Sequence, residues 1–226
     1  MRFMRAALAL CLALGVAACG SERDLQGVAL QAVGELFKPK APPAPVTNAQ
    51  IAQALQANAN PLILVEFEQR ENAQGLLTQV ETNGRYHTFG NQARNVIVLR
   101  DGMITSTRGL GGDLMSVEED ELLALVRSRS MGQVNYVQRF LTPEAVIEEQ
   151  RFRCAARPSG GKRVALGLVD AQATAVQVDC YGLHPETGAQ VEFTNTYAVS
   201  GNGMILSGRQ WVGAYLGYIG IQYLRR

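Results

Sequence analysis

Apolar and polar residues alternate along most of the chain from residue 61 onward. The segment Leu62-Ile63-Leu64-Val65-Glu66-Phe67 is a compact strand candidate. A period of two is typical of β-strands with one buried face. Alternating segments follow at 76–81, 85–89, 95–100, 103–107, 133–141, 147–156, 163–169, 173–181, 190–199, 204–211 and 218–224. Many short strands at this spacing predict a mainly β domain, an antiparallel β-sandwich or flattened barrel.

Three turn signals separate these strands. Thr82-Asn83-Gly84 and Asp101-Gly102 each lie between two alternating segments, and Ser200-Gly201-Asn202-Gly203 lies between a third pair. Asn, Asp and Gly tolerate the positive φ that tight hairpin turns require. We therefore predict that the flanking strands pair as antiparallel hairpins.

Short helices are predicted near the N-terminus and in the middle of the chain. Apolar residues recur at helical spacing within 20–38, and a second helix over 49–57 can be capped by Thr47 or Asn48. A third helix is predicted over 117–130. There Ser116 is the expected N-cap, and Glu119 three residues later completes a capping box.

The first twenty residues have the layout of a secretory signal. Arg2 and Arg5 precede an apolar run over 6–18, which is shorter than the roughly 20 residues that span a bilayer. Val16-Ala17-Ala18-Cys19-Gly20 resembles a bacterial lipobox, which implies cleavage before Cys19 and lipidation of its thiol. An ordinary signal peptide with an incidental Cys19 is the alternative.

This layout divides the chain into a signal peptide (1–18), a lipid-anchored segment (19–46) and a β-rich body (47–226). The anchored segment ends in a stretch with prolines at 39, 42, 43 and 45, which is stiff and extended. A lipoprotein cysteine carries two or three acyl chains, palmitate among them, and this number gives stable attachment. Gly20 and Ser21 favour placement on the outer membrane, facing the periplasm.

The charge of the mature chain excludes one broad class of partner. The segment 1–18 holds two arginines and no acid, so its removal leaves 19 basic and 20 acidic side chains. A near-neutral chain of this kind lacks the basic surface that nucleic acid binding requires.

Two cysteines remain in the body, Cys154 and Cys180. The alternation places each on the apolar face of its strand, beside Phe152 in one segment and Val178 in the other. In an oxidising compartment an even pair of this kind is typical of a disulfide. Two buried free thiols are the alternative.

No residue set with recognisable catalytic chemistry is found. The sequence lacks nucleophile-elbow, zinc-protease, phosphate-loop and EF-hand motifs. It holds only two histidines, so we expect no metal site and no cofactor. Glu66 and Glu68 share one strand face, and paired carboxylates can hydrolyse glycosides. This pair leaves a polysaccharide-modifying enzyme as an alternative to the non-enzymatic role that we expect.

Two segments hold candidate binding residues. Arg108 and Asp113 flank the glycine-rich run 109–112, and Arg209 precedes Trp211 near the C-terminus. Tryptophan beside arginine can stack on a sugar ring while the guanidinium binds hydroxyls. The alternative is that Trp211 is a core residue and Arg209 a structural donor.

These segments also carry a family resemblance. Together with the lipobox, the runs Gly102–Leu114 and Asn195–Trp211 resemble those of the YjbF/GfcB family of bacterial lipoproteins, and the similarity extends over about residues 50–226. The resemblance implies an accessory lipoprotein of exopolysaccharide or group 4 capsule production or export. Its expected partners are the membrane, the polysaccharide and outer-membrane export proteins. A purely structural envelope lipoprotein is a further alternative, and the family supplies no catalytic residue.

Overall fold

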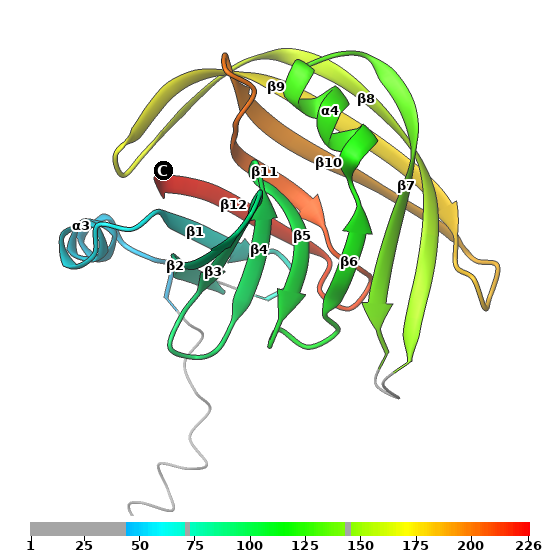
Figure 1. Ribbon diagram of the computed structural model, residues 1–226, viewed down its shortest axis with the longest axis horizontal. Helices are drawn as coiled ribbons and strands as arrows, with labels where there is room; N and C mark the ends of the chain where they lie inside the picture. The colour runs from blue at the N-terminus through cyan, green and yellow to red at the C-terminus, as the bar shows by residue number, and fades with distance from the viewer. Residues whose placement is uncertain (1–43, 71–72, 143–145) are drawn as a thin grey trace, which may run out of the picture. The chain divides into compact units, whose positions relative to one another are not determined.

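The alternating segments pair into one antiparallel sheet of twelve strands (Figure 1). The computed structural model describes residues 44–70, 73–142 and 146–226. The strands are β1 (Leu62–Phe67), β2 (Gln74–Asn83), β3 (Tyr86–Gly90), β4 (Val96–Arg100), β5 (Met103–Arg108), β6 (Leu114–Glu118), β7 (Gly132–Leu141), β8 (Ile147–Leu166), β9 (Val169–Leu183), β10 (Gln190–Ser200), β11 (Ile205–Trp211) and β12 (Tyr218–Arg225). The helices within these ranges are α3 (Asn48–Ala57) and α4 (Asp120–Ser128).

The order of strands in the sheet follows the chain almost everywhere. The sequence of neighbours is β5-β4-β3-β2-β1-β12-β11-β10-β9-β8-β7-β6. Every neighbouring pair is therefore consecutive in the chain except β1 and β12, which join the first strand to the last. The edges of the sheet are β5 and β6, which are themselves consecutive. The prediction of a mainly β, antiparallel domain is confirmed, with a nearly closed, barrel-like sheet.

Side chains bridge the two sheet edges where backbone pairing stops. The Leu114 N–H donates to Thr107 Oγ1 at 3.0 Å, and Arg108 Nη1 donates to the Leu114 carbonyl at 3.1 Å. Thr107 Oγ1 in turn donates to Asp113 Oδ1 at 3.0 Å. We call this set of contacts the β5–β6 seam, and it substitutes for a ladder at the point of closure.

Two adjoining clusters of apolar side chains fill the interior. One is centred on β1, β4 and β12 and contains Ile63, Phe89, Ile97, Leu99 and Ile219. The other contains Leu122, Leu123 and Val126 of α4, packed against Val176, Val178 and Val199 of β9 and β10. Helix α4 thus buries its apolar side on the sheet. A smaller cluster of Ile51, Leu62 and Leu224 attaches α3 to β1 and β12.

The two short helices differ in how well their starts were predicted. Thr47, one of the two expected caps, is the N-cap of α3 and forms a capping box with Gln50. The helix predicted over 117–130 begins only at Asp120, and its N-cap is Glu119, whose side chain makes no capping bond. The predicted Ser116 cap is wrong, because Ser116 belongs to β6 and pairs with Arg139 of β7. The helix predicted over 20–38 lies outside the described residues.

Strands β8 and β9 form a hairpin much longer than the short strands expected. The segments predicted separately as 147–156 and 163–169 are joined in β8, through Pro158. Proline is tolerated there because the β7 ladder stops at Ala156, so the missing N–H of Pro158 faces no partner strand. The hairpin curves over the sheet (Figure 1), and at its tip the Leu168 N–H donates to the carbonyl of Leu224 in β12.

The tight turns follow the expected chemistry with one shift. Asp101 and Gly102 both have positive φ, as the Asp-Gly signal predicts. In the β2–β3 hairpin, Asn83 is paired with Tyr86, so Gly84 and Arg85 form the turn. Only Gly84 of these two has positive φ. Within the described ranges, neither helix is long and apolar enough to cross a membrane.

Candidate functional site

A cavity of about 390 Å³ lies on the face of the sheet where β10, β11, β12 and β1 run side by side. Its floor is formed by two cross-strand rows. In the first, Thr196 pairs with Arg209, Arg209 with Gly220, and Gly220 with Glu66. The neighbouring row consists of Ala198, Ser207, Gln222 and Leu64. Gly220 has no side chain, so the floor is lowest between Arg209 and Glu66. We call this cavity the sheet groove.

The β8–β9 hairpin provides one wall of the sheet groove through Ser159 and Lys162. The polar side chains that line it are Glu66, Ser159, Lys162, Thr196, Ser207, Arg209 and Gln222. Neighbouring strands are about 4.8 Å apart, so four strands give a floor about 14 Å across. The groove therefore offers both hydrogen-bond donors, such as Arg209 and Lys162, and an acceptor, Glu66.

Arg209 is fixed in the groove by three neighbours. Its Nε and Nη2 donate to the two carboxylate oxygens of Glu68 at 2.5 and 2.7 Å, and Nη1 donates to the Thr194 carbonyl at 3.3 Å. The guanidinium carbon lies 3.3 Å from the ring centroid of Tyr218. Hydrogen bonding to Glu68 raises the pKa of Arg209 above its ordinary value. These bonds occupy three of the five N–H donors of the guanidinium, which leaves two for a ligand.

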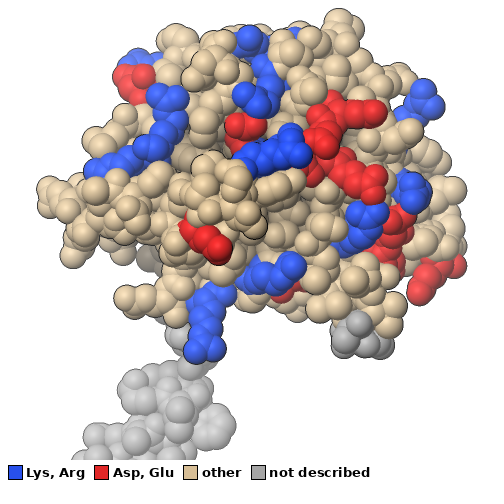
Figure 2. All heavy atoms as spheres, in the orientation of Figure 1, with Lys and Arg blue, Asp and Glu red and all other residues tan. Residues whose placement is uncertain are grey.

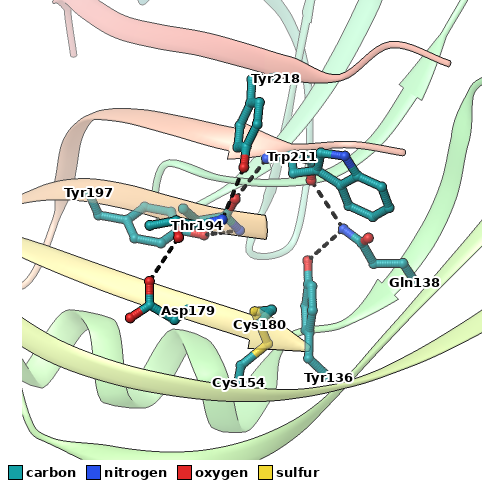
Figure 3. The surroundings of a disulfide bond; sticks show 10 residues. Tyr136, Gln138, Cys154, Asp179, Cys180, Thr194, Tyr197, Trp211 and Tyr218 are labelled. Atoms are coloured by element: carbon teal, nitrogen blue, oxygen red, sulfur yellow. Dashed lines mark hydrogen bonds between the residues drawn. A yellow bond between two sulfur atoms is a disulfide. The ribbon is translucent and has the colours of Figure 1, made fainter. Parts of the chain in front are cut away.

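The tyrosine beneath Arg209 is linked through Thr194 to Asp179 of β9. The backbone N–H of Thr194 donates to the Tyr218 hydroxyl at 3.0 Å, and the Thr194 hydroxyl donates to Asp179 at 2.8 Å (Figure 3). Burial raises the pKa of Asp179, but hydrogen bonds from Gln177, Thr194 and Arg157 outweigh it, and the net shift is downward. The carboxylate of Asp179 therefore stays ionised and orders the strand beside the groove.

Trp211, a second sequence candidate, is a core residue. Its side chain is 9 % exposed and stacks on Phe193 with centroids 4.5 Å apart. Edge contacts with Phe140 and Phe152 complete an aromatic cluster. The structure therefore follows the alternative that placed this tryptophan in the core, and its indole is not presented at the groove.

Buried amides hold the backbone of Trp211 in this position (Figure 3). Its N–H donates to Asn195 Oδ1 at 2.7 Å, and its carbonyl accepts from Gln138 Nε2 at 3.3 Å. The disulfide between Cys154 and Cys180 lies nearby, joining β8 to β9 where the two residues face each other across the ladder. The predicted disulfide is confirmed.

Arg108 and Asp113 serve the β5–β6 seam. Both contacts of Arg108 Nη1 are with backbone carbonyls, those of Thr107 and Leu114. Asp113 accepts from the N–H groups of Gly109 and Leu110 and from Thr107. The structure thus separates these two candidates from Arg209 and gives them loop-fixing contacts.

The strand carboxylates Glu66 and Glu68 have unequal surroundings. Glu66 lines the sheet groove, whereas Glu68 is held by both nitrogens of its bidentate pair with Arg209. A glycoside hydrolase needs one of its two carboxylic acids protonated. With both carboxylate oxygens of Glu68 engaged by Arg209, Glu66 is the member of the pair that stays open to the groove. Among the described residues, no group of three or more His, Cys, Asp or Glu is arranged to hold a metal ion.

Several residues that line the sheet groove were not predicted as binding candidates from the sequence. Lys162 and Ser159 reach the groove only because β8 continues through Pro158 and bends. Gly220 is placed beside Glu66, and Gln222 beside Leu64, only through the β1–β12 pairing. The period-two pattern did signal that Arg209 and Ser207 share a face, but it could not indicate which distant strands would lie beside them.

The charged side chains of the surface are interspersed. Figure 2 shows basic and acidic groups beside one another over the face in view. Many form ion pairs, such as Arg163 with Asp170 and Arg139 with Glu149. Exposed pairs of this kind contribute little to stability, and mixed charge of this kind matches the near-neutral composition. Cys19, the predicted lipidation site, lies outside the described residues.

Comparisons with known proteins agree with this fold. The chain matches the family model described as "Group 4 capsule polysaccharide lipoprotein gfcB, YjbF" over residues 33–224. It is similar to the crystal structure of the hypothetical lipoprotein YmcC from Escherichia coli (K12), with a TM-score of 0.66 and 13 % sequence identity. That similarity covers 80 % of this chain and 89 % of the other. No curated protein matches the chain.

The crystal structure supports the fold alone, because the sequence identity is low. The family match carries more weight, since it spans most of the sequence and contains β1 through most of β12. On these grounds the chain belongs to the YjbF family of group 4 capsule polysaccharide lipoproteins.

Proposed function

We propose that this protein is an accessory lipoprotein of capsule or exopolysaccharide production or export, and that it works by holding polymer in the sheet groove. The family match supports the association with capsule polysaccharide. The lipobox around Cys19 supports attachment by lipid, with the β-rich body facing the periplasm from the outer membrane. The groove then acts at the membrane surface, where a growing or exported chain passes.

One observation carries the binding proposal: a row of polar side chains crosses four strands with a glycine at its lowest point. A sugar chain presents hydroxyls at every unit, so it suits a floor that offers the polar side chains of Arg209, Ser207 and Gln222. The Arg209 guanidinium is already oriented by Glu68 and Tyr218. Little side-chain entropy is then lost on binding, which favours affinity.

The test fills the groove without disturbing the sheet. A side-chain carbon added at Gly220 would lie 3.5 Å from the Glu66 Cβ, an ordinary contact, so the strand accepts a Cβ there and the branched methyl groups of Gly220→Val would occupy the groove. We expect at least about tenfold weaker binding of purified capsular polysaccharide by this variant, and a similar loss in Arg209→Ala, measured by surface plasmon resonance on the full-length protein. Gly75→Val on β2 is the matched control, because nothing lies within 4 Å of its added carbon.

Unchanged polymer binding by a folded Gly220→Val variant would reject the groove as the binding site. The same preparations separate binding from catalysis. We expect polymer incubated with the wild-type protein to keep its length. Shortening of the polymer that disappears in Glu66→Gln would instead favour the enzyme alternative.

A further inference from the structure

A second cavity, of about 510 Å³, opens where β7, β8 and the β11–β12 loop meet. We propose that this cavity binds one uncharged sugar unit of a glycan, through hydroxyl donors and an aromatic face. We call it the end pocket. It shares no lining residue with the sheet groove, so the inference goes beyond the proposed function and can fail independently of it.

Two aromatic rings line the end pocket, and each rests on a glycine. A carbon added to Gly112 would lie 2.6 Å from Tyr215 Cδ1, and one added to Gly213 would lie 2.7 Å from Phe140 Cε1. Both glycines also have positive φ. Any side chain at either position would therefore displace a ring. The glycine-rich run 109–112 therefore also packs against the ring of Tyr215, in addition to its contacts in the β5–β6 seam.

Tyr215 is 68 % exposed although its ring is well supported. The loop that carries it is closed by two backbone bonds, from the Val212 N–H to the Gly217 carbonyl and from the Gly217 N–H to the Gly213 carbonyl. A large aromatic side chain held rigidly at a surface, next to a cavity, is typical of a ligand contact. The C–H face of a sugar ring fits this kind of surface.

A buried acceptor without a partner points to the polar part of the ligand. Gln150 is 7 % exposed and lines the pocket. Its Nε2 donates to Glu148 Oε1 at 2.5 Å. Because a carboxylate oxygen only accepts, this contact fixes the amide orientation and leaves Oε1 facing elsewhere. Among the described residues, Gln150 Oε1 has no hydrogen-bond partner, and a buried acceptor of this kind calls for a donor.

A backbone contact orients the neighbouring histidine. The Glu186 N–H donates to His184 Nδ1 at 3.3 Å, so Nδ1 acts as an acceptor in this arrangement. Nε2 lies 3.6 Å from Glu148 Oε1. Glu148, with its side chain 17 % exposed, therefore presents a partly buried carboxylate beside Gln150.

The chemistry of the ligand follows from this wall. No lysine or arginine lines the described part of the end pocket, and the Glu148 carboxylate repels an anion. The acceptors Glu148 and Gln150 require hydrogen-bond donors on the ligand, and the rings of Tyr215 and Phe140 require an apolar face on it. An uncharged sugar unit supplies both, because adjacent hydroxyls can donate to Glu148 and Gln150 while its C–H face covers Tyr215. An aliphatic ligand would leave Gln150 Oε1 unpaired, at a cost in affinity.

The experiment uses the full-length protein on an array of neutral, amino and acidic oligosaccharides. Affinities are then measured from the fluorescence of Trp211, the only tryptophan in the sequence, whose ring contacts Phe140 of the pocket. We expect binding of neutral sugars to weaken about tenfold or more in Tyr215→Ala and in Gln150→Leu. Tyr181→Ala, an exposed tyrosine on β9 at 47 % exposure, is the matched control.

The Gln150→Leu variant also separates a ligand contact from a structural one. It removes a buried unpaired acceptor, so we expect its melting temperature to be equal to or above that of the wild type. Three results would overturn the proposal: no binding on the array, a preference for acidic sugars, or undiminished affinity in Tyr215→Ala. Loss of binding only in Arg209→Ala would assign the sugar to the sheet groove and would leave the proposed function standing.

Discussion

Single buried amides connect parts of this fold that no ladder joins. Gln210 is 3 % exposed on β11, yet its Oε1 accepts from the Ile104 N–H at 2.9 Å and its Nε2 donates to the Gly102 carbonyl at 3.3 Å. The β4–β5 turn also lies close to β11, since a carbon added to Gly102 would lie 2.4 Å from the Ile205 carbonyl oxygen. One side chain therefore satisfies two backbone groups across the interior.

We expect Gln210→Leu to destabilise the protein by about 2–4 kcal/mol, because it leaves two buried backbone groups unpaired. The free energy of unfolding from urea titration measures this. Gln133→Leu is the control, since Gln133 is exposed on β7, and its effect should stay within about 0.5 kcal/mol. If the two substitutions lower the free energy of unfolding equally, the amide contacts of Gln210 do not stabilise the protein.

The alternation of apolar and polar residues correctly predicted which face of a strand a side chain lies on. It could not predict the role of a side chain whose partner is distant in the sequence. The alternation placed Cys154 and Cys180 on apolar faces, and they form the disulfide. Arg108 and Arg209 looked alike as glycine-flanked arginines near candidate segments. Only the structure shows that one binds carbonyls at the seam while the other faces Glu68 across β12.

At the scale of elements, the β8–β9 hairpin is the least expected part of the molecule. It supplies one wall of the sheet groove and reaches β12 through Leu168. Pro158 and Gly160 interrupt the alternation, so the sequence predicts a break between two strands. The ladder continues because Pro158 lies at an unpaired edge and Gly160 adopts a φ of 119° in a bulge.

The disulfide should stabilise this hairpin by limiting the unfolded chain. We expect the double variant Cys154→Ala, Cys180→Ala to lose about 3 kcal/mol of unfolding free energy, given the 26-residue separation. Urea titration with and without reductant checks this. Reductant should destabilise the wild type and leave the variant unchanged. A variant as stable as the oxidised wild type would contradict the expectation.

The mid-chain helix shows why local capping rules misplaced an element. Ser116 and Glu119 have the correct spacing for a capping box, but Glu119 is 4 % exposed and accepts from Tyr86 and Arg100. Burial opposes the charge of Arg100, but hydrogen bonds to Glu119 and Asp120 outweigh it and raise its pKa. The Glu119 carboxylate is therefore bound to Tyr86 and Arg100 and does not form the capping box, and β6 extends to Glu118.

For the whole molecule, the β5–β6 seam is the place where the two edges of the nearly closed sheet meet. The sequence is compatible with both a sandwich and a flattened barrel, because alternation specifies the face of each residue and not the neighbours of each strand. The seam consists of side-chain bonds from Thr107, Arg108 and Asp113. At this point side-chain bonds stand in place of the backbone ladders found between the other neighbouring strands.

We expect Thr107→Val to loosen the seam, because the Leu114 N–H then loses its buried acceptor. Native-state hydrogen exchange should show faster exchange at Leu114 and along β5 and β6, with the β8–β9 ladder unaffected. Thr105→Val is the control, since Thr105 is also buried in β5 but bonds the Val98 carbonyl within the β4–β5 pair. Identical exchange in both variants would contradict a closing role for the Thr107 hydroxyl.

The pairing of β1 with β12 has a consequence for the order in which the protein can fold. A chain that leaves the ribosome or a translocation channel from its N-terminus delivers β1 first and β12 last among these strands. Until β12 is free, β1 has a partner on one side only, and the sheet groove lacks Gly220 and Gln222. Strand β1 therefore keeps one edge without a backbone partner until β12, the last strand of the sheet in the chain, becomes available.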